Sequence, residues 1–260
     1  MGSERLAGRV ALVTGASSGL GRAVALSLGE QGAAVAVNYC RSEAAAREVA
    51  DAIRARGGSA ISIQADVSQP DAVAGMARAV RDELGPIELL VTSAGVTEYV
   101  PAEDLAALTK PVWDRILGVN VVGTFLCVQA ALSQMQPAGW GSIVLVSSNS
   151  AYTAEGSSIP YVVSKAAVVS LTEALARTLP STIRVNAVAP GWMNTPWLDR
   201  YLPAEVKADV VQAARFTAVD DVANAVLHLL SNESVNGAIL LVDPDRLQLR
   251  QRSPSETASM

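Results

Sequence analysis

Short apolar runs alternate with longer segments in which apolar residues recur every three or four positions. The short runs are rich in Val, Ile, Leu and Ala, as in buried strands, and the longer segments are typical of helices. The predicted strands cover 9–15, 34–40, 59–67, 87–95, 141–148, 181–191 and 237–243. The predicted helices cover 20–33, 42–58, 69–85, 111–135, a stretch starting near Tyr161, and 218–231. This alternation predicts a parallel sheet covered by helices on both faces.

The order of these elements predicts one domain rather than two. We expect a doubly wound α/β fold of about seven strands over residues 1–244 of the 260-residue chain. The last stretch, 245–260, is polar and irregular, and we expect it to be a mobile tail.

Composition narrows the classes of partner. Half of the residues are hydrophobic and 17% are charged, so the chain can bury a large core. A net charge of −5 argues against nucleic acid or an anionic membrane as the main partner. The chain has no uninterrupted run of 18 apolar residues, so we expect no membrane span. Cys40 and Cys127 form no CxxC pair, which favours a reduced, cytoplasmic setting. His228 is the single histidine, so we predict no metal site.

A glycine-rich stretch, TGASSGLG, joins the first predicted strand to the first predicted helix. Gly15, Gly19 and Gly21 let the backbone approach an anion, and the helix N-terminus behind them offers N–H groups and a positive dipole end. The spacing is GxxxGxG rather than GxGxxG. The position of this loop predicts a Rossmann-type dinucleotide site; a tight turn without a ligand is the alternative.

Tyr161 and Lys165 lie four positions apart in SIPYVVSKAA, with no nearby carboxylate. A free tyrosine has a pKa of about 10, and a cation one helical turn away stabilises the phenolate. Pro160 suits the first turn of a helix and places Tyr161 near its start. The pattern predicts a proton-transfer pair; an exposed helix pair is the alternative.

Several motifs in order along the chain resemble those of the short-chain dehydrogenase/reductase family, and in particular its 3-oxoacyl-acyl-carrier-protein reductase-like ketoreductases. The likeness covers roughly residues 5–244. The matching motifs are TGxxxGxG at Thr14–Gly21, ADV at Ala65–Val67, AG at Ala94–Gly95, Asn120, Ser148, YxxxK at Tyr161–Lys165, and PGxxxT at Pro190–Thr195.

The resemblance implies a set of catalytic residues. Ser148, favoured over Ser147 by its spacing from Tyr161, would orient the substrate carbonyl. Tyr161 would be the general acid in reduction and the base in oxidation. Lys165 would hold the ribose hydroxyls and lower the pKa of Tyr161, and Asn120 would support a proton-relay water.

The resemblance also implies the residues that hold the cofactor. Asp66 matches an adenine-contacting acid, Thr195 matches a residue that binds the carboxamide, and Val188 matches a position that faces the nicotinamide. The expected cofactor-binding set is Gly15, Ser17, Ser18, Gly19, Leu20, Gly21, Asn38, Tyr39, Arg41, Ser42, Asp66, Val67, Ser93, Ala94, Gly95, Tyr161, Lys165, Pro190, Gly191 and Thr195.

The end of the second predicted strand indicates which dinucleotide is bound. Tyr39 stands where an NAD enzyme carries an acid, so no carboxylate repels a 2′-phosphate there. Arg41 could pair with that phosphate, and Asn38 is expected to be a further donor to it. Ser42 follows Arg41, and Arg22 follows the glycine loop. We therefore expect NADP(H). The alternative is that Arg41 is a solvated charge ahead of the next helix.

Two stretches depart from the family pattern. Ser93 stands in TSAG where the family has Asn, which we expect to tie the fourth strand less well to its neighbours. The chain reads VDPDR where the family commonly reads VDGG, so Pro244 puts in doubt the contacts that the C-terminus would make.

The resemblance places a substrate lid at about 195–218. Trp192 and Trp197 are expected to bind the substrate together with Ser148 and Tyr161, and further aromatic and apolar contacts are expected from Met193, Leu198, Tyr201 and Leu202, with Tyr99 and Tyr152 flanking the site. We expect a medium-sized, partly apolar ketone, either a 3-oxoacyl thioester, free or on a carrier protein, or a secondary-metabolite carbonyl. The alternative for Trp192 and Trp197 is that they only attach the lid to the body.

The helix that begins near Tyr161 is small or apolar around most of its circumference. We expect Val168, Val169, Leu171 and Ala174 to face water in a monomer, which predicts a homodimer or homotetramer. Two other functions stay open: an NAD-dependent alcohol, sugar or steroid dehydrogenase, and a dinucleotide sensor without catalysis.

Overall fold

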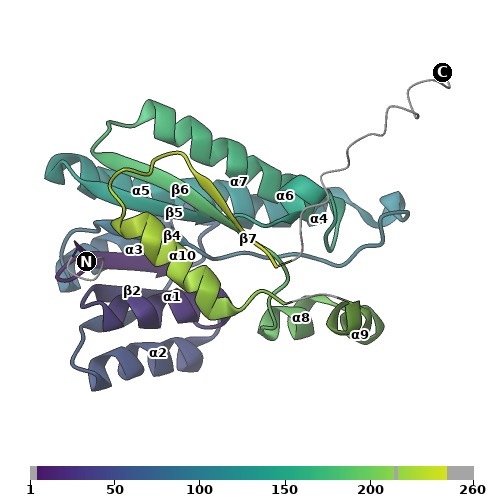
Figure 1. The fold of residues 1–260 in the computed structure, drawn as a ribbon, viewed down its shortest axis with the longest axis horizontal. Coiled ribbons are helices and arrows are strands. Elements are labelled where there is room, and N and C mark those ends of the chain that lie inside the picture. Colours follow the sequence, from purple (N-terminus) through teal and green to yellow (C-terminus); the bar gives the residue numbers. More distant parts are fainter. Residues whose placement is uncertain (1–4, 214–215, 245–260) are drawn as a thin grey trace.

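The computed structural model describes residues 5–213 and 216–244; the predicted tail lies outside these residues. A seven-stranded parallel sheet forms its centre, in the order β3-β2-β1-β4-β5-β6-β7 (Figure 1). The strands are β1 Val10–Thr14, β2 Ala34–Tyr39, β3 Ala60–Gln64, β4 Leu89–Thr92, β5 Gly141–Val146, β6 Ile183–Pro190 and β7 Ile239–Val242. The predicted fold class is confirmed.

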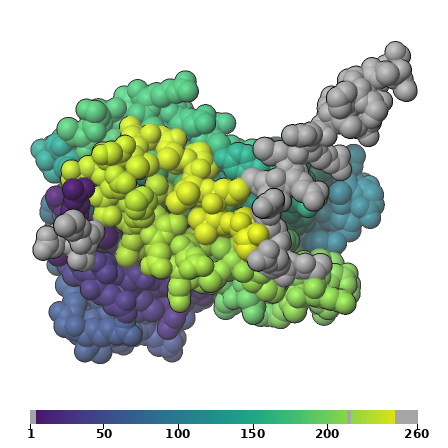
Figure 2. Space-filling model, in the orientation of Figure 1, coloured from purple at the N-terminus to yellow at the C-terminus, as the bar shows by residue number. Residues whose placement is uncertain are grey.

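Helices cover both faces of the sheet. The helices are α1 Gly19–Glu30, α2 Glu43–Ala55, α3 Pro70–Glu83, α4 Lys110–Leu117, α5 Thr124–Ala138, α6 Ser150–Thr153, α7 Ile159–Thr178, α8 Pro196–Tyr201, α9 Ala204–Ala213 and α10 Val219–Ser231. A 3-10 turn covers Leu105–Ala107. Buried residues of α1, α2 and α10 form the core on one face, and those of α3, α5 and α7 form the core on the other. Figure 2 shows α10 and β7 spread over one side of the molecule, with the short helices α8 and α9 at one end.

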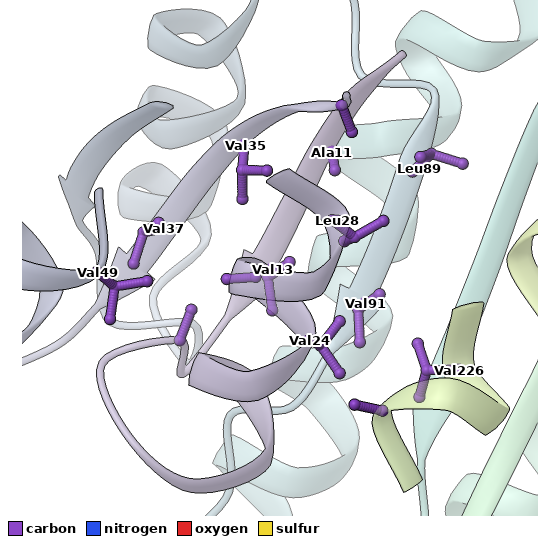
Figure 3. Packing of buried hydrophobic residues seen from close by; sticks show 14 of the residues in the cluster. Ala11, Val13, Val24, Leu28, Val35, Val37, Val49, Leu89, Val91 and Val226 are labelled. Carbon is purple, nitrogen blue, oxygen red and sulfur yellow. The ribbon is translucent and has the colours of Figure 1, made fainter. Parts of the chain in front are cut away.

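Alternation along each strand explains the two cores. Ala11 and Val13 of β1 contact the cluster that contains Val24 and Leu28 of α1 (Figure 3), whereas Leu12 belongs to the opposite cluster. All of β1 is buried, as expected for a strand covered on both faces.

The predicted strands extend past the observed ends at the carboxyl side of the sheet. The predicted strands included residues 65–67, 93–95 and 147–148, but the observed β3, β4 and β5 end before these residues. These apolar and small residues leave the sheet to line a cavity. The order of the strands reverses at β1 and β4, where open α/β sheets bind ligands.

The helix predicted at 111–135 contains an interruption. A π-helical turn over Gly118–Gly123 separates α4 from α5, and Asn120 lies in this turn. Such turns often occur at functional sites. The segments Lys110–Ala138 and Ile159–Thr178 are long and apolar enough to cross a membrane, but in this fold both contribute side chains to the core on the sheet.

The predicted outward stripe on α7 is partly wrong. Val168 is 1% exposed and belongs to the core, and Leu171 packs against that core. The large apolar residues of α7 that are exposed are Ile159 and Val163, at 37% and 41%, whereas Ala174 is exposed as predicted. The helix is apolar on nearly every side, so sequence periodicity could not identify its buried face.

Candidate functional site

A cavity of about 540 Å³ lies at the carboxyl edge of the sheet. It runs from the loop between β1 and α1, past the ends of β2, β4, β5 and β6, to the start of α7 and to α8. Every predicted cofactor- and substrate-binding residue lines it, apart from Gly21, Arg22 and Val188. The predicted Asn120 also lies outside the lining.

The glycine loop has a geometry that only glycine fits. Gly15 and Gly19 have positive φ angles of 61° and 54°. A Cβ at Gly15 would lie 2.8 Å from the Cα of Ala94, and a Cβ at Gly21 would lie 2.5 Å from the carbonyl oxygen of Gly15. Gly21 therefore allows α1 to pack under the loop, and Gly15 allows the loop to approach β4.

The N-terminus of α1 faces this cavity. Ser18 is the N-cap and makes no side-chain capping bond, and no acidic residue occupies the first turn. Ser17, Ser18 and Gly19 line the cavity at this point. Free N–H groups, a positive dipole end and a low glycine backbone fit the pyrophosphate of a dinucleotide.

Asn38 differs from the expected phosphate donor. It is 1% exposed, and its Oδ1 accepts a hydrogen bond from the N–H of Gly15 at 3.2 Å. Its Nδ2 donates to the carbonyl of Ala65 at 3.1 Å, and its own carbonyl accepts from the N–H of Ala16 at 2.8 Å. Asn38 thus holds the glycine loop against β3, and its amide is already engaged.

The far end of the cavity is lined by Tyr39, Arg41 and Ser42, as predicted, and by Asp66. Arg41 is exposed, and it forms no ion pair within residues 5–213 and 216–244. Asp66 Oδ1 accepts hydrogen bonds from the N–H and the hydroxyl of Ser68, at 2.9 and 2.7 Å. A guanidinium at the mouth of the cavity can reach an anionic group bound at this end.

With Ser93 in place of the family's Asn, the end of β4 is still attached to β1. Thr14 Oγ1 at the end of β1 accepts a hydrogen bond from the N–H of Ala94 at 3.1 Å. The bond joins the segments that follow β1 and β4.

Ser148, Tyr161 and Lys165 converge in the middle of the cavity. Tyr161 lies in the first turn of α7 and lines the cavity together with Ser148, which follows β5 and whose hydroxyl lowers the pKa of the phenol. The Nζ of Lys165 lies 5.6 Å from the centroid of the Tyr161 ring and donates to the carbonyl of Val146 at 2.9 Å. Ser147 Oγ instead donates to the carbonyl of Lys165 at 2.8 Å, so Ser148 is the serine beside the phenol.

Burial dominates the electrostatics of this cluster. It raises the pKa of Tyr161 to about 12, against the hydrogen bond from Ser148, which lowers it. Burial also lowers the pKa of Lys165 to about 8. In the protein alone the pKa of Tyr161 is raised rather than lowered, because desolvation of the phenolate is the largest effect. Near neutral pH the phenol is protonated and most of the ammonium is charged.

Asn120 lies behind the cavity wall. Its Oδ1 accepts from the N–H of Val96 at 2.9 Å, and its Nδ2 donates to the carbonyl of Val96 and to Ser164 Oγ, at 3.0 and 2.9 Å. The side chain therefore ties the segment after β4 to α7, one turn from Tyr161. It is 1% exposed.

Aromatic rings close the other end of the cavity. The Trp197 ring lies 6.1 Å from that of Tyr161 and 4.5 Å from that of Tyr201, measured between centroids. Trp197 also lies against Gly95, where an added Cβ would be 3.7 Å from the indole. Trp197 both lines the cavity and attaches α8 to the body. Tyr99 and Tyr152, which were predicted to flank the site, do not line the cavity.

Sequence reasoning missed a polar group of lining residues that follows β5. These are Asn149, Ser150, Gly156 and Ser157. Ser150 Oγ lies 3.1 Å from Ser148 Oγ, and Ser157 Oγ lies 2.5 Å from Thr97 Oγ1. The polar run SSNS at the end of a buried strand was a usable signal for Asn149 and Ser150.

Known proteins share this architecture and its motifs. A family model described as short chain dehydrogenase matches residues 9–205. A ketoacyl reductase of the granaticin polyketide synthase of Streptomyces violaceoruber is 40% identical over 90% of this chain and 94% of its own length. The 3-oxoacyl-[acyl-carrier-protein] reductase of Staphylococcus aureus is 38% identical over 86% of this chain and 91% of its own length.

A solved structure of a short chain dehydrogenase is also similar to this chain. A short chain dehydrogenase from Burkholderia cenocepacia J2315, crystallised with NADP, is 36% identical to the chain and superposes with a TM-score of 0.82, over 92% of this chain and 98% of that one. The family model covers more than half of the chain, and the relatives match nearly all of it. The protein therefore belongs to the short-chain dehydrogenase/reductase family of oxidoreductases.

Proposed function

We propose that the protein is an NADP(H)-dependent oxidoreductase that reduces a ketone to a secondary alcohol. The observation that carries the proposal is the meeting of Ser148, Tyr161 and Lys165 inside the cavity that begins at the glycine loop, with Lys165 Nζ 5.6 Å from the centroid of the Tyr161 ring. A protonated phenol next to a hydroxyl donor suits a carbonyl oxygen that must gain a proton.

Ser148, Tyr161 and Lys165 have different roles in the proposed reaction. NADPH, when bound in this cavity, would supply the hydride that reduces the carbonyl carbon. Ser148 donates a hydrogen bond to the carbonyl oxygen, and Tyr161 transfers its proton to that oxygen as the carbon is reduced. Lys165, buried one turn from Tyr161, carries the positive charge that stabilises the phenolate left behind. Its ammonium is also the group suited to the ribose hydroxyls of the cofactor.

The residues at the Arg41 end of the cavity support NADP(H) as the cofactor over NAD(H). Arg41 is exposed at the mouth of the cavity, and β2 ends on Tyr39 rather than on an acidic residue. The Burkholderia cenocepacia relative was solved with NADP. An Arg41→Ala variant should raise the KM for NADPH about tenfold and leave the KM for NADH nearly unchanged. An equal effect on both cofactors would exclude Arg41 from 2′-phosphate binding and favour an NAD-dependent dehydrogenase.

The lid supports a medium-sized, partly apolar ketone. Trp192, Trp197, Tyr201 and Leu198 line the substrate end of the cavity, and apolar and aromatic walls bind apolar substrates. The relatives include a polyketide ketoacyl reductase and a 3-oxoacyl-carrier-protein reductase. We place the substrate among 3-oxoacyl thioesters, free or carrier-bound, and secondary-metabolite ketones.

An exposed apolar surface supports self-association. Val122 and Phe125, in the π turn and α5, and Val163 of α7 are 51%, 43% and 41% exposed, and α7 contacts the π turn. Burial of such side chains favours a homodimer or homotetramer. Sedimentation velocity at micromolar concentration tests this, and a monomer alone would exclude it. The free thiols of Cys40 and Cys127 support a cytoplasmic location.

The test of function uses purified protein, NADPH and a panel of ethyl acetoacetate, an acetoacetyl thioester, cyclohexanone and 1-tetralone, followed at the nicotinamide absorbance. Tyr161→Phe should abolish turnover and leave the Kd for NADPH near wild type. Normal turnover by this variant would refute the assigned acid. Tight NADPH binding with no turnover of any carbonyl would favour the dinucleotide sensor.

A further inference from the structure

A side-chain link joins the end of β7 to the segment that carries Ser148. Asn149 Nδ2 donates a hydrogen bond to Asp243 Oδ2 at 2.8 Å, across 94 positions of sequence. On the other side of the same amide, Ser148 Oγ donates to Asn149 Oδ1 at 3.2 Å. One amide therefore contacts both the serine beside Tyr161 and a carboxylate from the last strand of the sheet.

Close packing fixes the carboxylate of Asp243. A Cβ at Gly191 would lie 2.5 Å from Asp243 Oδ1, so the carboxylate packs directly on the glycine backbone. The N–H of Gly191 donates to the carbonyl of Val242 at 3.0 Å, and the N–H of Asn149 donates to the carbonyl of Pro190 at 2.9 Å. Asp243 thus lies where the Ser148 segment meets the Pro190–Gly191 motif, with little room to move.

The carboxylate determines how the amide is oriented. An ionised carboxylate only accepts hydrogen bonds, so the NH₂ group of Asn149 must face Asp243 and its oxygen must face Ser148. The opposite orientation would bring two oxygens together at the position of the 2.8 Å bond. The N–H of Ser150 donates to Ser148 Oγ at 3.2 Å. Ser148 therefore receives a backbone hydrogen bond and has one proton to donate, either to Asn149 Oδ1 at 3.2 Å or to Ser150 Oγ at 3.1 Å.

We propose that Asn149 and Asp243 are positioning residues that keep the Ser148 hydroxyl aligned as a donor beside Tyr161. The inference rests on the proposed ketone reduction. The bond from Ser148 to Asn149 is long, and thus weak, so the proton can leave it for a substrate carbonyl. The pair gives a role to the VDPD sequence at the end of β7, because its first Asp forms the link.

Two single variants test the link. Asn149→Ala and Asp243→Ala should each lower kcat for the best ketone of the panel about tenfold, the cost of one misaligned hydrogen bond, with the Kd for NADPH within about twofold. Asn232→Ala is the matched control, since its Oδ1 accepts from the N–H of Ser234 beyond the end of α10. The control should keep wild-type kcat. Unchanged kcat in both test variants would overturn the proposal.

Coupling and rescue separate positioning from loss of stability. The double variant Asn149→Ala/Asp243→Ala should be no slower than the slower single variant, because both changes remove one link. Exchanging the two side chains, Asn149→Asp with Asp243→Asn, restores a donor and an acceptor across the gap and should bring kcat to within about threefold of wild type. Additive losses with no rescue would overturn the proposal.

A measurement without turnover separates this inference from the proposed function. Ser148 lowers the pKa of Tyr161, so Asn149→Ala should move the tyrosinate titration of the NADP⁺ complex to higher pH, measured by ultraviolet absorbance against Tyr161→Phe. A shifted titration in a protein that reduces no ketone would support the link and refute the proposed function. An unchanged titration would overturn the link whether or not ketones are reduced.

Discussion

Gly15→Ala tests whether the glycine loop needs its close approach to β4. The new methyl group would lie 2.8 Å from the Cα of Ala94 and 2.9 Å from its N, both backbone atoms. Relief to an ordinary 3.4 Å contact needs a movement of about 0.6 Å, which a packed strand end resists. The positive φ of 61° adds a second cost, because alanine disfavours the left-handed region.

These two costs can be separated. The left-handed conformation costs about 1 kcal/mol, and overpacking against backbone costs about 1–3 kcal/mol more, so the free energy of unfolding should fall by about 2–4 kcal/mol. Gly57→Ala is the matched control, with φ of 83° and nothing within 4 Å of the added Cβ. It should lose only about 1 kcal/mol. Urea unfolding measures both variants.

The same variant should weaken cofactor binding. Displacement of the loop moves the N–H groups at the start of α1, so the Kd for NADPH should rise about tenfold or more in Gly15→Ala and stay at the wild-type value in Gly57→Ala. Fluorescence titration of NADPH measures this. Equal stability and equal affinity in the two variants would refute the account of the loop.

Three further changes follow from the buried groups and the lid. The folded pKa of Lys165 is about 8 against 10.5 unfolded, so its charge opposes folding below pH 8. The free energy of unfolding should therefore rise between pH 8 and 10.5 by on the order of 3 kcal/mol more in wild type than in Lys165→Met, and parallel urea curves would contradict this. Arg184 is 4% exposed and donates to three carbonyls and one hydroxyl, so Arg184→Met should cost about 3 kcal/mol by urea unfolding. Arg47→Met is the control at an exposed arginine and should lower the free energy of unfolding by less than about 0.5 kcal/mol. Similar losses in the two variants would refute the stabilising role of the buried Arg184. Trp197→Ala should raise the KM for 1-tetralone about tenfold at constant NADPH affinity. The control Trp113→Ala, outside the cavity lining, should keep the wild-type KM. A wild-type KM in Trp197→Ala would show that Trp197 only attaches the lid to the body.

The parts of the site that could be predicted from sequence depend on contacts between neighbours in the chain. The GxxxGxG loop and the four-residue spacing of Tyr161 and Lys165 are local, because a strand-to-helix turn and one helical turn determine their geometry. Apolar strands buried on both faces could be read from composition alone.

Other parts depend on residues that meet only in the folded chain. Asn38 is paired with Gly15 and Ala65, so its engaged amide is invisible in the sequence, which suggested a free donor. Asn149 meets Asp243 across 94 positions. The pKa of Tyr161 depends on how completely the surrounding elements bury it, and the spacing of a nearby Lys cannot report that.

Burial of Tyr161 also makes the two directions of reaction respond differently to pH. With a pKa of about 12, only about one phenol in 10⁵ is ionised at pH 7. Ketone reduction needs the protonated form, so its kcat/KM should stay flat until Lys165 begins to lose its proton near pH 8, and then fall. Alcohol oxidation needs the phenolate as base, and the positive charge of oxidised nicotinamide favours that form. Its rate should therefore rise with pH between 6 and 9, while the rate of reduction does not. Parallel profiles for the two directions over this range would show that Tyr161 is not the group that exchanges the proton.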